Sequence, residues 1–99
     1  MITASQCRAA RALTEISREL LAERSGIAEK MIADFERKIS ELDDASIEKL
    51  RHALETMGAL FIAENGGGIG VRLKFTRSET RRILSLENEG GQTADDEIP

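Results

Sequence analysis

Residues 17–27 have the sequence Ser17-Arg18-Glu19-Leu20-Leu21-Ala22-Glu23-Arg24-Ser25-Gly26-Ile27. Ser17 is a candidate N-cap for a short helix, because its hydroxyl can accept a hydrogen bond from a free amide in the first turn. Gly26 can end that helix, since glycine adopts the positive φ that a tight turn requires. Ala22 is small enough to let a second helix cross closely. The stretch therefore predicts a short helix, a glycine turn and a second helix that begins with an apolar residue.

Local signals also bound the helices on either side of this stretch. The segment Ile2-Thr3-x-x-Gln6 has the form of a capping box and predicts a helix over about residues 4–13. After the glycine turn, a helix is expected over about residues 28–37, with Ile32 and Phe35 in the core.

A fourth helix is expected after residue 43. Asp43 or Asp44 can cap it, and Gly58 can end it. Its apolar residues keep the three- and four-residue spacing of a buried helix face: Ile47, Leu50, Leu54 and Met57.

The hydrophobic pattern changes after Gly58. Residues 60–63 form a short apolar run, and apolar and polar residues alternate over residues 71–76. The glycine-rich sequence Asn65-Gly66-Gly67-Gly68 separates them, so a β-hairpin is predicted over residues 59–76. An isolated hairpin is marginal in water, so this one should lie on the helices, pair with another chain, or both.

The predicted fold is therefore mainly α, with a four-helix bundle over residues 1–58 followed by the hairpin. Residues 77–87 are a candidate short last helix, and the acidic residues 88–99 are expected to be a disordered tail.

Composition narrows the class of protein. The chain has 99 residues and a net charge of −4, and no apolar run approaches the roughly 18 residues of a membrane span. The single Cys7 excludes a disulfide framework and a multi-cysteine metal site. No secretory signal is visible at the start, so a reducing cytoplasmic location without membrane contact is expected.

The acidic charge is unevenly distributed along the chain. Residues 1–86 hold thirteen acids against fourteen bases, and the remaining five acids follow Leu86. Residues 72–82 are locally basic. The net charge therefore does not exclude a nucleic-acid partner, although any affinity for DNA should be modest and sensitive to salt.

The ordered set of elements resembles the lambda-repressor-like, or Xre-type, helix-turn-helix family of bacterial transcriptional regulators. The resemblance covers about residues 3–57 and rests on the patterns of residues 7–13, 17–27 and 32–37 with the capped helix over residues 45–57. The hairpin resembles a C-terminal extension found in part of the family. The resemblance implies a homodimer that binds a double-stranded DNA operator with the helix over residues 28–37 in the major groove.

The resemblance also implies roles for particular residues. Arg18 takes a position where family members usually carry a glutamine that contacts phosphate. Arg11 and Glu36 match a structural ion pair between the first and third helices. The outward positions of the recognition helix would include Ala33. The candidate DNA-binding residues are Arg18, Glu29, Lys30, Met31, Asp34, Arg37 and Lys38.

Three departures from the family pattern weaken the expectation of DNA binding. Ala28 replaces the usual Ser or Thr cap, and Lys38 replaces a glycine after the recognition helix. Glu29 and Asp34 place negative charge where it repels phosphate. The alternative is a protein-interaction module, such as an antitoxin-like or anti-activator protein, on the same scaffold. In a third reading, the acidic tail competes with DNA for the basic segment.

The hairpin is the candidate dimerisation element, through strand addition. The residues expected at that interface are Phe61, Ile62, Val71, Leu73 and Phe75.

No enzyme or cofactor site is predicted. His52 lies off the apolar stripe of its helix and is expected in solvent, and Cys7 is expected to be a small buried residue. The glycines of residues 66–70 do not fit a phosphate-binding loop, because no helix follows them.

Overall fold

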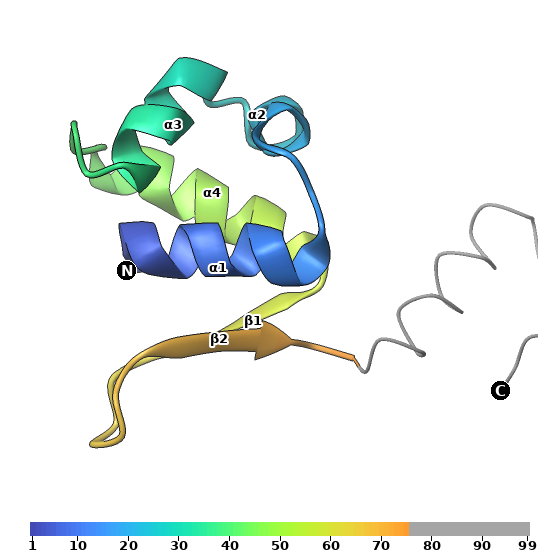
Figure 1. Ribbon diagram of the computed structural model, residues 1–99, viewed down its shortest axis with the longest axis vertical. Coiled ribbons are helices and arrows are strands. Elements are labelled where there is room, and N and C mark those ends of the chain that lie inside the picture. Colours follow the sequence, from blue (N-terminus) through green and yellow to red (C-terminus); the bar gives the residue numbers. More distant parts are fainter. Residues whose placement is uncertain (76–99) are drawn as a thin grey trace, which may run out of the picture.

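The computed structural model describes residues 1–75 and contains four helices followed by a two-stranded antiparallel hairpin (Figure 1). The elements are α1 (Ala4–Thr14), α2 (Arg18–Ser25), α3 (Glu29–Glu36), α4 (Asp44–Thr56), β1 (Ala59–Ile62) and β2 (Gly70–Leu73). The candidate helix over residues 77–87 and the acidic residues 88–99 lie outside the described part of the chain.

The predicted caps of the first two helices are confirmed. Thr3 Oγ1 accepts a hydrogen bond from the Gln6 amide at 3.1 Å, and Gln6 Oε1 accepts one from the Thr3 amide at 2.9 Å, which completes the capping box of α1. Ser17 Oγ accepts from the Leu20 amide at 3.0 Å at the start of α2. Gly26 ends α2 with φ +79°.

The four helices enclose a small aliphatic core. The predicted stripe of α4 is confirmed, with Ile47, Leu50 and Leu54 buried and Met57 partly buried against them. Ile32 and Phe35 face the same core from α3. Leu21 is the buried residue of α2, so this short helix depends on its neighbours for stability.

The hairpin lies on the helices, as one of the sequence-based alternatives required. β1 contacts α4 and α1, and β2 contacts α1. Figure 1 shows the hairpin on the opposite side of α1 from α2 and α3. The strands pair with Phe61 opposite Val71 and Ala59 opposite Leu73.

A buried glutamine holds the hairpin to α1. The Gln6 side chain is only 6% exposed, and its Nε2 donates to the Gly70 carbonyl at 2.8 Å and the Ile62 carbonyl at 3.4 Å. Gln6 was predicted only as part of a cap. Its second role escapes sequence reasoning because the two segments are 64 residues apart.

Several expectations need correction in detail. The strands begin and end one or more residues earlier than the predicted runs, and the third helix is one residue shorter at each end. Ala33 was expected to point outward, but it is buried, because it lies on the same side of α3 as Ile32 and Glu36.

Candidate functional site

The candidate site is the outward side of α3 together with the start of α2. Glu29, Lys30, Met31 and Arg37 are exposed, and Met31 is 44% exposed. Ile32 and Phe35 hold the opposite side of α3 in the core. Among the described residues, the outward side of α3 therefore carries both charged and apolar side chains, while its inward side is packed in the core.

The charges on this surface partly cancel. Lys30 Nζ donates to Asp34 Oδ2 at 2.9 Å, although the lysine side chain is 84% exposed. Opposite charges four residues apart on a helix are the sequence signal for this pair, which was not predicted. Lys30 is thus not a free cation, and a DNA base would have to compete with Asp34 for it.

The start of α3 lacks a side-chain cap. Ala28 is the N-cap residue, and it makes no side-chain hydrogen bond to the helix. Alanine has no side-chain oxygen, so it cannot accept a hydrogen bond from the first turn of α3. Glu29 in the first turn interacts favourably with the helix dipole, which offsets part of the loss.

Lys38 ends α3 in a left-handed conformation, with φ +63°. The Lys38 amide donates to the Phe35 carbonyl at 3.0 Å, and the Ile39 amide donates to the Asp34 carbonyl at 2.8 Å. This is the hydrogen-bond pattern of a Schellman motif, in which glycine is the usual residue. Lys38 therefore adopts the backbone turn that glycine usually makes in this motif, and its side chain is exposed.

Behind α3 lies a buried carboxylate that joins three helices. Glu36 is 2% exposed, and its oxygens accept hydrogen bonds from Arg11 Nε and Nη2, both at 2.8 Å. Cys7 Sγ donates to Glu36 Oε2 at 3.2 Å. We call Glu36, Arg11, Arg18 and Cys7 the Glu36 cluster.

The contacts within the cluster shift the pKa values of Glu36 and Cys7. Burial acts to raise the pKa of the Glu36 carboxyl, but hydrogen bonds from Arg11 and Cys7 and the charges of both arginines outweigh it, so this pKa lies below its ordinary value. Burial, with the charge of Glu36, raises the pKa of the Cys7 thiol. Cys7 is fully buried, as predicted, but its role as a donor to Glu36 was not predicted.

Arg18 is the most weakly held member of this cluster. Its Nε is 3.3 Å from Glu36 Oε1, and its side chain is 31% exposed. The Nε atom is buried and makes no hydrogen bond. Arg18 is therefore attracted to Glu36, with only part of its guanidinium open to a phosphate.

The five candidate dimerisation residues differ in their surroundings. Phe61 and Val71 pack against the helices of their own chain, so strand addition is not needed to cover them. Ile62 and Leu73 are half-buried, and Phe75 is 41% exposed. Leu60 alternates with Phe61 and faces away from the helices, and it was not predicted as a contact.

The residues set aside as functional candidates lie where expected. His52 is exposed. The amides of Gly66 and Gly68 both donate to Glu64 Oε2, at 3.0 and 3.2 Å, so the chain's own carboxylate occupies the glycine loop. Within residues 1–75, no three metal-ligating side chains cluster, and no helix is long and apolar enough to cross a membrane.

Comparison with known proteins adds no functional information. No family model matches the chain, and a search of the curated proteins found no match.

Proposed function

We propose that the protein is a sequence-specific transcriptional regulator of the lambda-repressor-like type, which binds an operator as a homodimer with α3 in the DNA major groove. The exposed outer side of α3 carries this proposal, because Glu36 fixes the helix to α1 and α2 from behind. A recognition helix needs such rigid support, because hydrogen bonds to the edges of DNA bases tolerate little displacement of the helix.

Each residue of the surface has a proposed role. Lys30 contacts a base edge after leaving Asp34, while Glu29, Met31 and Asp34 shape the preference for sequence. Arg18, Arg37 and Lys38 contact phosphates. Two-fold symmetry of the dimer then requires half-sites about one helical turn apart.

The charge of the surface sets the strength of binding. Glu29 and Asp34 offset Lys30 and Arg37 on α3, so few phosphates can be neutralised by one protomer. Because phosphate neutralisation dominates non-specific affinity, the protein should bind random DNA weakly and depend on dimerisation for operator affinity.

The experiment compares three variants with the wild type by fluorescence anisotropy on a selected operator and on random DNA. Lys30→Ala should cost about 1–3 kcal/mol on the operator and less on random DNA, whereas Arg37→Ala should weaken both alike and reduce the salt slope by about one. Arg8→Ala removes an exposed cation of α1 and should change neither. Equal changes in operator affinity and in random-DNA affinity for all three variants would contradict sequence recognition by α3.

The homodimer has its own test. Ile62→Glu places a charge at one of the proposed dimer contacts on β1. It should therefore raise the dimer dissociation constant measured by analytical ultracentrifugation. Met31→Glu is the control, because Met31 is 44% exposed on α3, which lies on the opposite side of α1 from the hairpin (Figure 1). A dimer that Ile62→Glu leaves intact would place the interface elsewhere.

A protein-interaction module is the second candidate function. The Lys30–Asp34 pair favours it, because the single cation within α3 is already paired with a carboxylate one turn away. Co-purification of the full chain from its native cell separates the two functions. A stoichiometric protein without DNA would support the module, and DNA without such a protein would exclude it.

A further inference from the structure

A shallow groove runs along one end of the helical bundle, between the start of α1 and the connection from α3 to α4. We call it the end groove. Its floor is apolar and consists of Ala4, Phe35, Leu42 and Ile47.

The walls of the end groove are large apolar side chains that the described chain leaves uncovered. Ile39 is 66% exposed and Met1 is 73% exposed. A cluster of exposed apolar residues around one groove is typical of a binding surface. Glu41 and Asp44 lie at its rim, with Lys38 as the one side-chain cation.

The chain contains a segment of matching chemistry. Residues 77–86, outside the described part, have the sequence Arg77-Ser-Glu-Thr-Arg-Arg-Ile-Leu-Ser-Leu86. The segment contains three arginines and one glutamate, and three large aliphatic residues follow the arginines. Such a segment can place apolar side chains on the groove floor and a cation beside Glu41 or Asp44.

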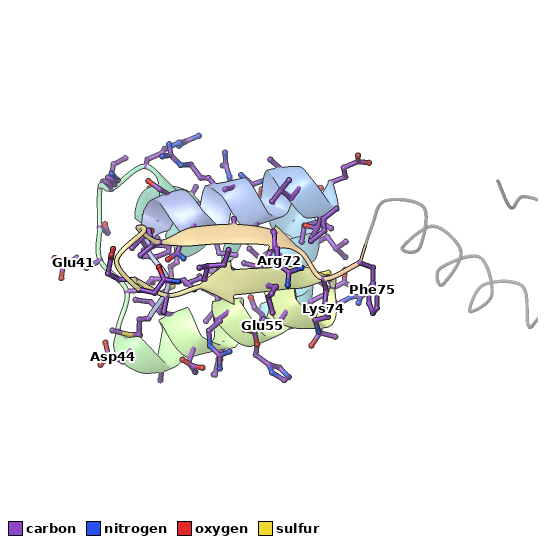
Figure 2. The ribbon with its side chains drawn as sticks, turned by 90° about the horizontal axis from the view of Figure 1, so that it is seen from below. Glu41, Asp44, Glu55, Arg72, Lys74 and Phe75 are labelled. Carbon is purple, nitrogen blue, oxygen red and sulfur yellow. The ribbon has the colours of Figure 1, made fainter. Side chains whose placement is uncertain are left out.

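The direction of the hairpin decides which copy supplies this segment. Figure 2 shows Glu41 and Asp44 at one end of the molecule and Lys74 with Phe75 at the other, so the chain leaves β2 at the end far from its own groove. Antiparallel strand addition around a two-fold axis reverses the hairpin of the second copy, whichever strand forms the contact. The residues after Phe75 of that copy then start beside the end groove of the first.

We infer that, in the proposed homodimer, the end groove of each copy binds the 77–86 segment of the other. The exchange covers Ile39 and Met1, and it makes dimer affinity depend on residues beyond the hairpin. The inference rests on the proposed homodimer but not on DNA binding.

Cysteine cross-linking of the full chain tests the exchange. Ile39→Cys and Leu84→Cys variants carrying different tags are co-expressed, oxidised and analysed on a non-reducing gel. The native Cys7 is fully buried and does not compete. A covalent heterodimer is expected, while Arg24→Cys paired with Leu84→Cys should give none, because Arg24 is exposed outside the end groove.

Other outcomes would overturn the inference. An Ile39→Cys/Leu84→Cys double variant that cross-links within one chain, while the co-expressed pair does not, would show that each segment folds back on its own groove. Absence of any cross-link would show that the segment does not occupy the groove.

Ultracentrifugation supplies an independent measurement. Ile39→Asp and Leu84→Asp should each raise the dimer dissociation constant about tenfold or more, and the double variant should do no worse than the stronger single one. A wild-type dimer that both variants leave unchanged would overturn the exchange while leaving the homodimer intact. A monomeric wild type would overturn both, and DNA binding would still be measured separately.

Discussion

Glu36 is the residue on which the first three helices converge. Its carboxylate is almost completely buried and contacts Arg11 of α1, Arg18 of α2 and the thiol of Cys7. A buried charge is tolerated only when it is paired and hydrogen-bonded, so removing the charge leaves the arginines without their partner.

A neutral substitution at Glu36 tests how much this buried charge stabilises the fold. Glu36→Gln should lower the free energy of unfolding by about 3 kcal/mol, because Arg11 then lacks its ionic partner. Urea unfolding followed by circular dichroism measures the change. Glu48→Gln is the control, because the Glu48 pair with Arg51 lies in solvent, and it should have little effect. Equal losses in the two variants would contradict the importance of the buried pair.

The same residue predicts a dependence of stability on pH. The pKa of Glu36 is lower in the folded state than its ordinary value of 4.5. Between the two pKa values the unfolded chain binds more protons, so the stabilisation is complete above about pH 5 and is lost as the pH falls. Urea unfolding from pH 7 to pH 3 should show a smaller pH dependence in Glu36→Gln than in the wild type. Identical profiles would show that other carboxyls cause the acid sensitivity.

Two substitutions of Lys38 separate the effect of backbone strain on stability from the effect of its charge on DNA binding. Its positive φ is unfavourable for a residue with a Cβ, so Lys38→Gly should raise the free energy of unfolding by about 0.5–1 kcal/mol. Lys38→Ala keeps the strain and should not stabilise. Under the proposed function both variants should weaken DNA binding to the same extent, because both remove the phosphate contact. Stabilisation by alanine as well as glycine would contradict the strain argument.

At the scale of elements, the N-terminus of α1 positions the hairpin. Gln6 uses its oxygen to cap α1 and its nitrogen to bind the carbonyls of Gly70 and Ile62. The proposed dimer surface therefore depends on a side chain of the helical bundle.

Gln6→Glu tests this dependence. A glutamate can still complete the capping box, but its carboxylate cannot donate to the two carbonyls. Amide hydrogen exchange in β2 should become faster, while exchange in the middle of α4 changes less. Thr3→Ala removes the other half of the box and should cost about 1 kcal/mol without a selective effect on β2. Uniform acceleration in both variants would mean that Gln6 acts only as a cap.

The limits of sequence reasoning also appear at this scale. Local signals were sufficient where neighbouring residues make the contact, as in the Ser17 cap, the Gly26 stop and the stripe of α4. They were insufficient for the contacts of Gln6 with Gly70 and of Cys7 with Glu36, because these depend on how separate elements pack. The conformation of Lys38 was not predicted, because a lysine side chain gives no sign of a positive φ, although the resemblance places a glycine at this position.

At the scale of the whole molecule, the two sides of the bundle have different proposed tasks. The outer side of α3 would contact DNA, and the hairpin lies on the opposite side of α1 (Figure 1). A dimer built through the hairpin would thus leave both recognition helices uncovered. The net charge of −4 is compatible with this arrangement, because five acids follow Leu86 in the sequence.

In-vitro selection of DNA bound by the full chain at low ionic strength tests the central claim most directly. The account predicts a palindromic consensus with half-sites about one helical turn apart, which Lys30→Ala alters at a symmetric pair of positions. Recovery of no enriched sequence, or of a consensus that Lys30→Ala leaves unchanged, would contradict it.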